Sequence, residues 1–225
     1  MKPETRKARG GRPLSFDRDV ALRRAMELFW ARGYEGTTLE DLLTAMGGLT
    51  PPSFYNAFGS KEALFKEAAD LYIATVGVLP VRALEEARTA REGIEAMLRR
   101  AVESFSQPGM PHGCLLLLGA TKCAPANQGP QAYLHAVRQR APEGIGSRLR
   151  RAVAEGDVSP DADLSRIVSF YVTVAHGLAV RAGDGATRAD LMAAVDGAMA
   201  AWAEMAKPQR ASGKQGRKGR TRTGA

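Results

Sequence analysis

Cysteine and histidine are scarce in this chain. It has two cysteines and three histidines among 225 residues. Two cysteines cannot form the disulfide framework of a small secreted domain, so their number favours a reducing compartment, the cytoplasm. The histidines, His112, His135 and His176, are scattered, and none has another possible metal ligand four residues away. This distribution argues against the common zinc motifs.

Motifs of catalytic and phosphate-binding sites are missing as well. The sequence has no nucleophile elbow, no phosphate-binding glycine loop and no closely spaced cysteine pair. One cluster of soft metal ligands remains: Met110, His112 and Cys114, with Cys123 nearby. On one continuous helix the two cysteines would point to opposite sides, because each residue turns the helix by ~100°. Cysteines packed as small apolar side chains are the alternative that we favour, and we predict no enzyme activity, no cofactor and no metal site.

Long apolar segments are also absent. The longest candidate, Ile167–Val180, is interrupted by Ser169, Thr173 and His176 and is shorter than the ~20 residues that a membrane-spanning helix needs. The N-terminus is basic, but no apolar signal segment follows it. We therefore expect a protein that makes no use of a membrane.

The positive charge of the chain is concentrated at its two ends. Residues 1–14 carry a net charge of +4 and residues 207–225 a net charge of +7, so residues 15–206 carry −3 of the total of +8. We expect a flexible basic arm at 1–14 and a disordered basic tail at 207–225. Such ends are solvated in many proteins, but beside a DNA-binding motif they add attraction for phosphates. Arg12 is then a candidate for an adjacent minor groove.

The most informative stretch is Thr37–Phe65, which predicts short helices separated by a tight turn. Thr38 and Asp41 have the spacing of a capping box, which satisfies free N–H groups at a helix start. The residues that follow are apolar at helical spacing, and Gly47-Gly48 ends this helix, because glycine accepts the left-handed conformation of a tight turn.

A second short helix is predicted over residues 51–58. Thr50 is a good N-cap, and Pro51-Pro52 occupy first-turn positions, where a proline costs little. Phe54 and Phe58 form its apolar face, and its other side chains are small or form hydrogen bonds. This is helix–turn–helix organisation, in which the second helix enters the major groove of DNA.

The same residues carry a resemblance to a known family. LFWARGYEGTTLEDL (Leu28–Leu42) and FYNAFGSKEALF (Phe54–Phe65) are similar to two motifs of the TetR family of bacterial transcriptional regulators. The resemblance extends from about Ser15 to Leu71. It implies a regulator that dimerises through its last two long helices and binds a small molecule among the helices between about 70 and 180. No residues are assigned to that ligand pocket.

Asn56 is the best candidate for base contact, since its amide can pair with adenine in the major groove. Hydroxyl groups and helix N-termini nearby suit phosphates. The predicted DNA-contacting residues are Arg12, Thr38, Thr50, Pro51, Pro52, Ser53, Tyr55, Asn56 and Lys61. In the alternative, Tyr55 packs with Phe54 and Phe58, and Asn56 is only solvated.

The rest of the chain is predicted to be helical, which makes the fold class all-α. We expect a first helix capped by Ser15, a DNA-binding domain over 15–77 with its motif at about 38–58, and a ligand-binding and dimerisation domain over 78–206. The helix from Ser60 is expected to end near Gly77, with Pro80 as the domain boundary. Further helices are expected near 81–90, 91–106, 113–123, 131–155, 161–182 and 187–206, the fourth of them kinked by Pro142 and Gly144.

The last two helices are predicted to form a subunit interface, as a four-helix bundle about a two-fold axis. Ile167–Val180 is apolar nearly all round, and the final helix has one apolar seam rich in small residues. The predicted interface residues are Ile167, Phe170, Val174, Gly177, Leu191, Val195, Ala198 and Trp202. The alternative is an internal helical pair that covers the core.

The sequence as a whole predicts a homodimeric transcriptional repressor that a small-molecule effector releases from a palindromic operator in double-stranded DNA. Two alternatives remain open. One is an enzyme or small-molecule carrier with an appended DNA-binding module, and the other is a ligand-independent DNA-binding protein.

Overall fold

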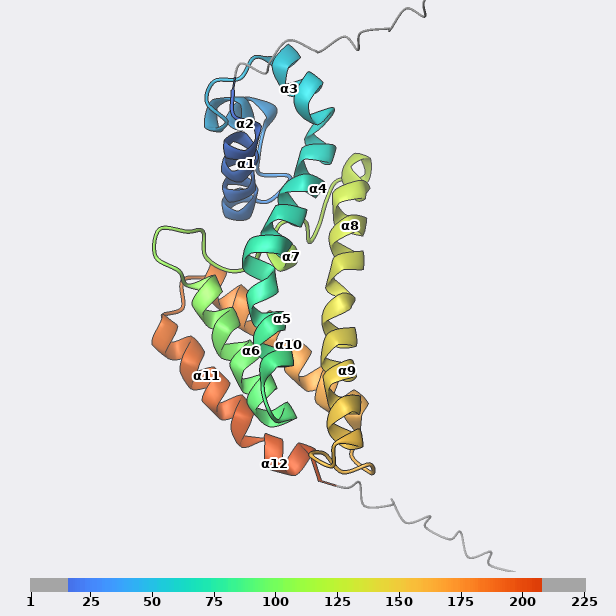
Figure 1. Cartoon of the computed structure of the whole chain (residues 1–225). Coiled ribbons are helices and arrows are strands. Elements are labelled where there is room, and N and C mark those ends of the chain that lie inside the picture. Colours follow the sequence, from blue (N-terminus) through green and yellow to red (C-terminus); the bar gives the residue numbers. More distant parts are fainter. Residues whose placement is uncertain (1–15, 208–225) are drawn as a thin grey trace, which may run out of the picture.

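Residues 16–207 are described by the computed structural model, and this part of the chain is helical without any strand (Figure 1). The all-α prediction is therefore confirmed. The helices are α1 (Arg18–Arg32), α2 (Leu39–Ala45), α3 (Pro51–Phe58), α4 (Lys61–Tyr72), the π-helix η1 (Ile73–Gly77), α5 (Val78–Glu86), α6 (Ala90–Phe105), α7 (Leu115–Leu118), the 3-10 helix η2 (Pro125–Asn127), α8 (Gln128–Arg138), α9 (Arg140–Ala154), α10 (Leu164–Gly183), α11 (Arg188–Ala200) and α12 (Trp202–Met205).

Helices α1, α2, α3 and the start of α4 form a small lobe at the upper end of Figure 1, which we call the head. An aromatic cluster fills its centre: Phe29 and Tyr34 each meet the ring of Phe65 edge-on, at centroid distances of 5.0 and 5.2 Å. The N-cap of α1 is Asp17, whose carboxylate accepts the N–H groups of Asp19 and Val20. Asp17 therefore takes the capping role predicted for Ser15, which lies outside the described residues.

A long helical rod joins the head to the body below it. Helices α4, η1 and α5 follow one another without a break, so the helix that starts at α4 does not end near Gly77 as predicted but continues past Pro80 (Figure 1). A proline inside a helix clashes with the carbonyl group four residues earlier. Here that carbonyl belongs to Val76, in η1, and the wider turn of a π-helix accommodates such irregularities. The rod therefore departs from regular α-helix geometry between the head and the body.

The body packs around α10. This helix contacts α6, α9 and α11, and α11 also packs on α6. Ile167, Tyr171 and Leu178 of α10 are buried, but Phe170 and Gly177 reach the surface. Within residues 16–207, one face of α10 is therefore left uncovered by the other helices.

Two predicted helices differ from the observed ones. The segment 131–155 forms α8 and α9, which are interrupted at Gln139, three residues before Pro142, rather than one kinked helix. Of the predicted helix 113–123, only the single turn α7 forms. The two cysteines therefore do not lie on one continuous helix. Cys114 is buried and Cys123 is partly exposed.

None of the helices within residues 16–207 is long and apolar enough to cross a membrane.

Candidate nucleic-acid interface

Helix α3 lies at the far end of the head, away from the body (Figure 1). Its N-cap is Thr50, with Pro51 at the first helical position, as the sequence predicts. Phe54 and Phe58 are buried in the head. The opposite face is open to solvent and carries Pro51, Pro52, Tyr55 and Asn56.

The side chains on this face differ in how far they are already engaged. Asn56 makes no hydrogen bond within residues 16–207, so its amide is free to bind a partner. Tyr55 packs edge-on against the ring of Phe54 at 5.3 Å, yet 51% of its surface is exposed. The ring of Tyr55 therefore packs on Phe54, while half of the residue's surface remains open to a partner.

The threonine hydroxyls act as helix caps. Thr38 Oγ1 donates to Asp41 Oδ2 at 2.7 Å and accepts the Asp41 N–H, which confirms the predicted capping box. Thr50 Oγ1 lies 3.0 Å from Ser53 Oγ and accepts the Ser53 N–H. These hydroxyls fix the starts of α2 and α3. A phosphate only accepts hydrogen bonds, so it would have to be bound by neighbouring N–H groups, or by the one hydroxyl proton that Thr50 and Ser53 do not share with each other.

Lys61 is less available than the sequence suggests. Its ammonium lies 4.2 Å from the centre of the Tyr34 ring, a cation–π arrangement. Burial lowers the pKa of Lys61, although Glu35 and two other groups favour its charged form. Lys61 would have to leave this ring to reach a phosphate.

Two arginines of α1, which the sequence analysis did not single out, support this surface. Arg18 stacks over Phe58 at 4.6 Å and pairs with Glu67 at 2.7 Å, so it holds the end of α3. Arg24 is exposed and lies beside Gly47 in the turn before α3. No salt bridge occupies Arg24 within residues 16–207. Its sequence signal was weak, because an exposed arginine on the polar face of a helix is common. Arg12 lies outside the described residues.

The back of the head rests on residues 113–127, which we call the docking segment. Trp30 Nε1 donates to the carbonyl oxygen of Gly113 at 3.1 Å, and the Tyr34 N–H donates to that of Gly119 at 2.7 Å. Glu35 Oε1 accepts the Ala124 N–H at 2.8 Å and Asn127 Nδ2 at 3.0 Å. These bonds, of Asn127 first and Ala124 second, lower the pKa of Glu35. The head is therefore attached to the body through both the rod and the docking segment.

The predicted dimer residues fall into two groups. Five are buried within the chain itself: Ile167, Leu191, Val195, Ala198 and Trp202. The other three, Phe170, Val174 and Gly177, lie on the uncovered face of α10. A helical stripe of apolar residues looks the same in both cases, which is why the sequence did not separate them.

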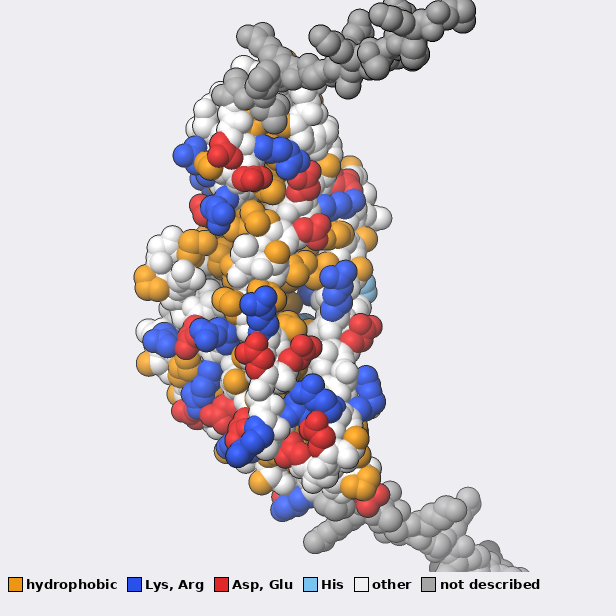
Figure 2. Space-filling view, in the orientation of Figure 1, with side chains coloured by type: hydrophobic (Ala, Val, Ile, Leu, Met, Phe, Trp, Pro, Cys, Tyr) orange, Lys and Arg blue, Asp and Glu red, His pale blue; other side chains and the backbone are white. Residues whose placement is uncertain are grey.

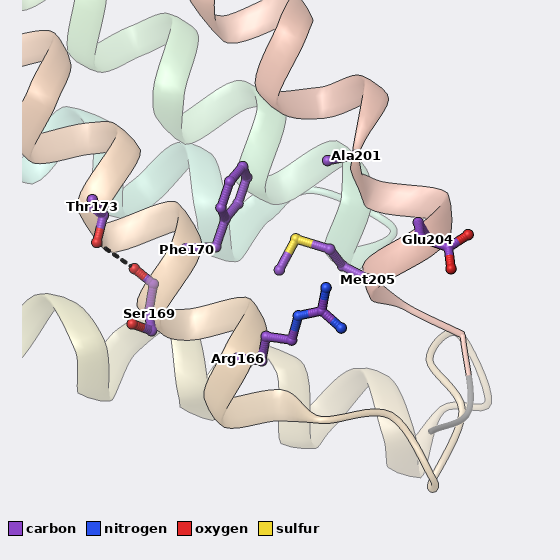
Figure 3. A pocket seen from close by; sticks show the side chains of 7 residues that line it. All are labelled: Arg166, Ser169, Phe170, Thr173, Ala201, Glu204 and Met205. Carbon is purple, nitrogen blue, oxygen red and sulfur yellow. Dashed lines mark hydrogen bonds between the residues drawn. The ribbon is translucent and has the colours of Figure 1, made fainter. Parts of the chain in front are cut away.

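The uncovered face continues onto the last helices as an apolar seam between α10 and α11. One hollow of about 480 Å³ lies between Phe170, Ala201 and Met205, with Arg166 and Glu204 at its rim (Figure 3). A second, of about 330 Å³, lies beside Val174 and Gly177. The helical glycines Gly177 and Gly197 have open space where a side chain would stand. The seam is therefore grooved, and small and apolar residues line it together with charged ones such as Arg181 and Asp190 at the second hollow.

Within residues 16–207 no group of three or more histidine, cysteine or acidic side chains could hold a metal ion. Cys114 is buried, and burial raises the pKa of its thiol.

Comparison with known proteins gives matches over most of the chain. Residues 21–68 match the family described as bacterial regulatory proteins, tetR family, and residues 90–195 match the tetracyclin repressor-like C-terminal domain. The HTH-type transcriptional repressor ComR of Escherichia coli (strain K12) is 30% identical over 88% of this chain and 94% of its own length. The repressor BdcR of the same organism is 29% identical over 78% of this chain and 83% of its own.

A solved structure is more similar still. A cysteine mutant of the TetR family transcriptional regulator CifR, complexed with 26-bp double-strand operator DNA, is 43% identical and superposes with a TM-score of 0.82. The match covers 85% of this chain and all of that one.

Proposed function

The chain belongs to the TetR family of bacterial transcriptional regulators, and from this premise we propose that it is a homodimeric repressor. The dimer binds a palindromic operator in the cytoplasm, and a small molecule bound in the body releases it. Residues up to about 77 serve as the DNA-binding domain and residues 78–206 as the ligand-binding and dimerisation domain. The proposal includes no catalytic activity, in keeping with relatives that are regulators.

The observation that carries the proposal is the presentation of α3. This helix holds Phe54 and Phe58 in the head and turns Asn56 and Tyr55 outward at the end of the molecule. A helix with an anchored apolar face and an exposed amide suits insertion into a major groove. The relative CifR, which is complexed with operator DNA, supports the same use of the head.

Dimerisation follows from the seam between α10 and α11. An uncovered apolar face on a regulator needs a partner, and a palindrome needs two reading heads related by a two-fold axis. In the proposed interface Phe170, Val174 and Gly177 contact the second copy. The predicted interface residues that are buried within one chain pack α10 and α11 against the rest of the body.

Release requires that the ligand favours an arrangement of the body in which the heads no longer fit the operator. Two connections transmit such a change, the rod with η1 and the docking segment 113–127. A coupling of ~1–3 kcal/mol would weaken operator binding by about 5- to 150-fold. By reciprocity, the ligand binds the operator-bound protein more weakly by the same factor.

The test begins with selection of binding sites from a pool of random duplex DNA by the full-length protein. The proposal expects a palindromic consensus, protected from cleavage over two half-sites about one helical turn apart. Binding to a scrambled duplex of equal length serves as the control. A protein that enriches no sequence, or binds both duplexes equally, contradicts the proposal.

A further inference from the structure

Arg138, the last residue of α8, is a cation without an acidic partner. Its guanidinium is half-buried, and Nη1 donates one hydrogen bond, to the carbonyl oxygen of Leu116 at 2.9 Å. Within residues 16–207 no carboxylate forms a salt bridge with it. A guanidinium has five N–H donors, and a cation removed from water without an anion is costly. Burial accordingly lowers the pKa of Arg138. The arrangement provides an anion site that the chain itself does not fill.

The groups around Arg138 come from several elements of the body. The positive charge of Arg138 lowers the pKa of the Cys114 thiol, before α7, and that of the His176 imidazole on α10, although burial has the larger effect on each. Tyr72, at the end of α4, and Cys114 each influence the pKa of the other. We call Tyr72, Cys114, Arg138 and His176 the Arg138 cluster. It joins the rod, the docking segment and two helices of the body.

The Arg138 cluster carries a single positive charge. Burial, with a smaller contribution from Arg138, lowers the pKa of His176, so its imidazole is neutral at pH 7. Cys114 and Tyr72 are also neutral, because burial raises the pKa of both. A neutral imidazole can donate one hydrogen bond to an anion. The balance of charge therefore fits an anion with one negative charge.

The surroundings of the cluster are apolar. Leu134 is fully buried next to it on α8, and Leu116 and Leu117 of α7 are packed against the core while still partly accessible. Figure 2 shows apolar side chains gathered across the middle of this face, around a hollow between α5 and the α8–α9 pair. A molecule that reaches Arg138 must therefore be mostly hydrophobic.

We propose that the effector of this regulator is a hydrophobic monocarboxylic acid whose carboxylate binds Arg138. This inference rests on the proposed function and names the chemical class of its ligand. The planar guanidinium matches a carboxylate with two parallel hydrogen bonds. The apolar part of the acid lies among the leucines of α7 and α8.

The position of Arg138 also explains how such an acid acts on the head. At present Arg138 holds the carbonyl of Leu116, whose side chain lies 3.8 Å from where a side chain on Gly77 would begin. Gly77 ends η1, and Gly119, three residues after Leu116, receives the Tyr34 N–H of the head. A carboxylate that binds the unused N–H donors of Arg138 reorients its guanidinium relative to the Leu116 carbonyl, and α7 shifts with it. The change then reaches the head through η1 and the docking segment.

The test uses the full-length protein with octanoate, dodecanoate and phenylacetate, each compared with its neutral amide. Calorimetry measures binding, and fluorescence anisotropy measures release from the selected operator. We expect at least one acid to bind about tenfold or more tightly than its amide, which corresponds to about 1.4 kcal/mol, and to release the operator. In Arg138→Gln we expect the affinity for the acid to fall to that for the amide, and the affinity for the amide to stay unchanged. The control Arg140→Gln removes an exposed arginine two residues away and keeps the preference.

Arg138→Lys keeps the charge but loses the planar fork, so it should give an intermediate preference, and it replaces Arg138→Gln if that variant does not fold. Equal binding of acids and amides, binding of none of the acids, or an unchanged preference in Arg138→Gln each overturns the inference. Operator binding without ligand is measured first. A protein that binds its operator but prefers no acid contradicts this inference alone, and one that prefers acids but binds no operator contradicts the proposed function.

Discussion

At the scale of single residues, Asn56 is the side chain on which sequence reading should depend most. It is exposed on α3, and nothing else in the described part of the chain uses its amide. We predict that Asn56→Ala weakens operator binding by roughly 1–3 kcal/mol and relaxes the preference at one position of each half-site. Competition binding on operator duplexes with single base-pair changes measures both effects.

A scrambled duplex provides the control for Asn56. Loss of a base contact leaves non-specific binding nearly unchanged, because that binding comes from phosphates. Equal losses on operator and scrambled DNA would make Asn56 a positioning residue and end its assignment to base readout.

Arg24 should behave in the opposite way. Its guanidinium is exposed beside the turn that precedes α3, so a contact with the DNA backbone is the interaction open to it. We predict that Arg24→Ala weakens binding to all sequences alike and lowers the slope of log K against log salt by about one unit per half-site. Arg23→Ala is the matched control, since its side chain points ~100° away around α1. Equal slopes for wild type and Arg24→Ala would remove this contact.

Local rules accounted for the ends of the short helices. The Thr38–Asp41 capping box and the Thr50 cap depend on residues within one turn, so the sequence alone predicted them. Lys61 shows the limit of such rules. Its partner Tyr34 is distant in sequence, and only the folded head brings the ammonium onto that ring.

At the scale of elements, the docking segment was the least predictable part of the chain. The apolar run around Leu115 favours a helix, but Gly113 adopts a φ of 78°, and only α7 remains helical. The head contributes Trp30, Tyr34 and Glu35 to the bonds that hold this segment. Contacts of this kind join residues some ninety positions apart, and a pattern read along a short window contains no information on them.

The Glu35 bonds make the attachment of the head dependent on pH. The pKa of Glu35 is lower in the folded protein than in the unfolded chain, so its contribution is fully present above the ordinary pKa of a glutamate. That contribution is lost as pH falls through the lowered value. We predict that the melting-temperature advantage of wild type over Glu35→Gln, clear at pH 7, begins to shrink near the ordinary glutamate pKa of about 4.3 and disappears as pH falls through the lowered value. Thermal unfolding between pH 7 and pH 3 measures it.

Glu40→Gln is the control for Glu35, because Glu40 is an exposed glutamate of the same head. Its substitution should leave the pH dependence of wild type unchanged. A difference between wild type and Glu35→Gln that stays constant down to pH 3 would show that the charge of Glu35 does not hold the docking segment.

At the scale of the whole molecule, the sequence predicted an interface on the last two helices, but it did not separate the residues that are buried within one chain from those that reach the surface. Trp202 and Val195 belong to the same apolar stripes as Phe170, yet the first two are buried inside one chain. A helix buried on one side by its own chain and on the other by a second copy is apolar nearly all round. Only the three-dimensional packing separates the two faces.

Gly177 offers a direct test of the dimer, because a side chain there has open space in the single chain. We predict that Gly177→Glu is monomeric in sedimentation at micromolar concentration and binds the operator far more weakly, since it places bulk and charge on the seam. The fold of the single chain should not suffer, because replacing glycine inside a helix is favourable by roughly 0.5–1 kcal/mol. Gly144→Glu is the matched control, as Gly144 lies within α9 and is equally unobstructed. If both variants remain dimeric and bind the operator as wild type does, the two copies do not meet at α10.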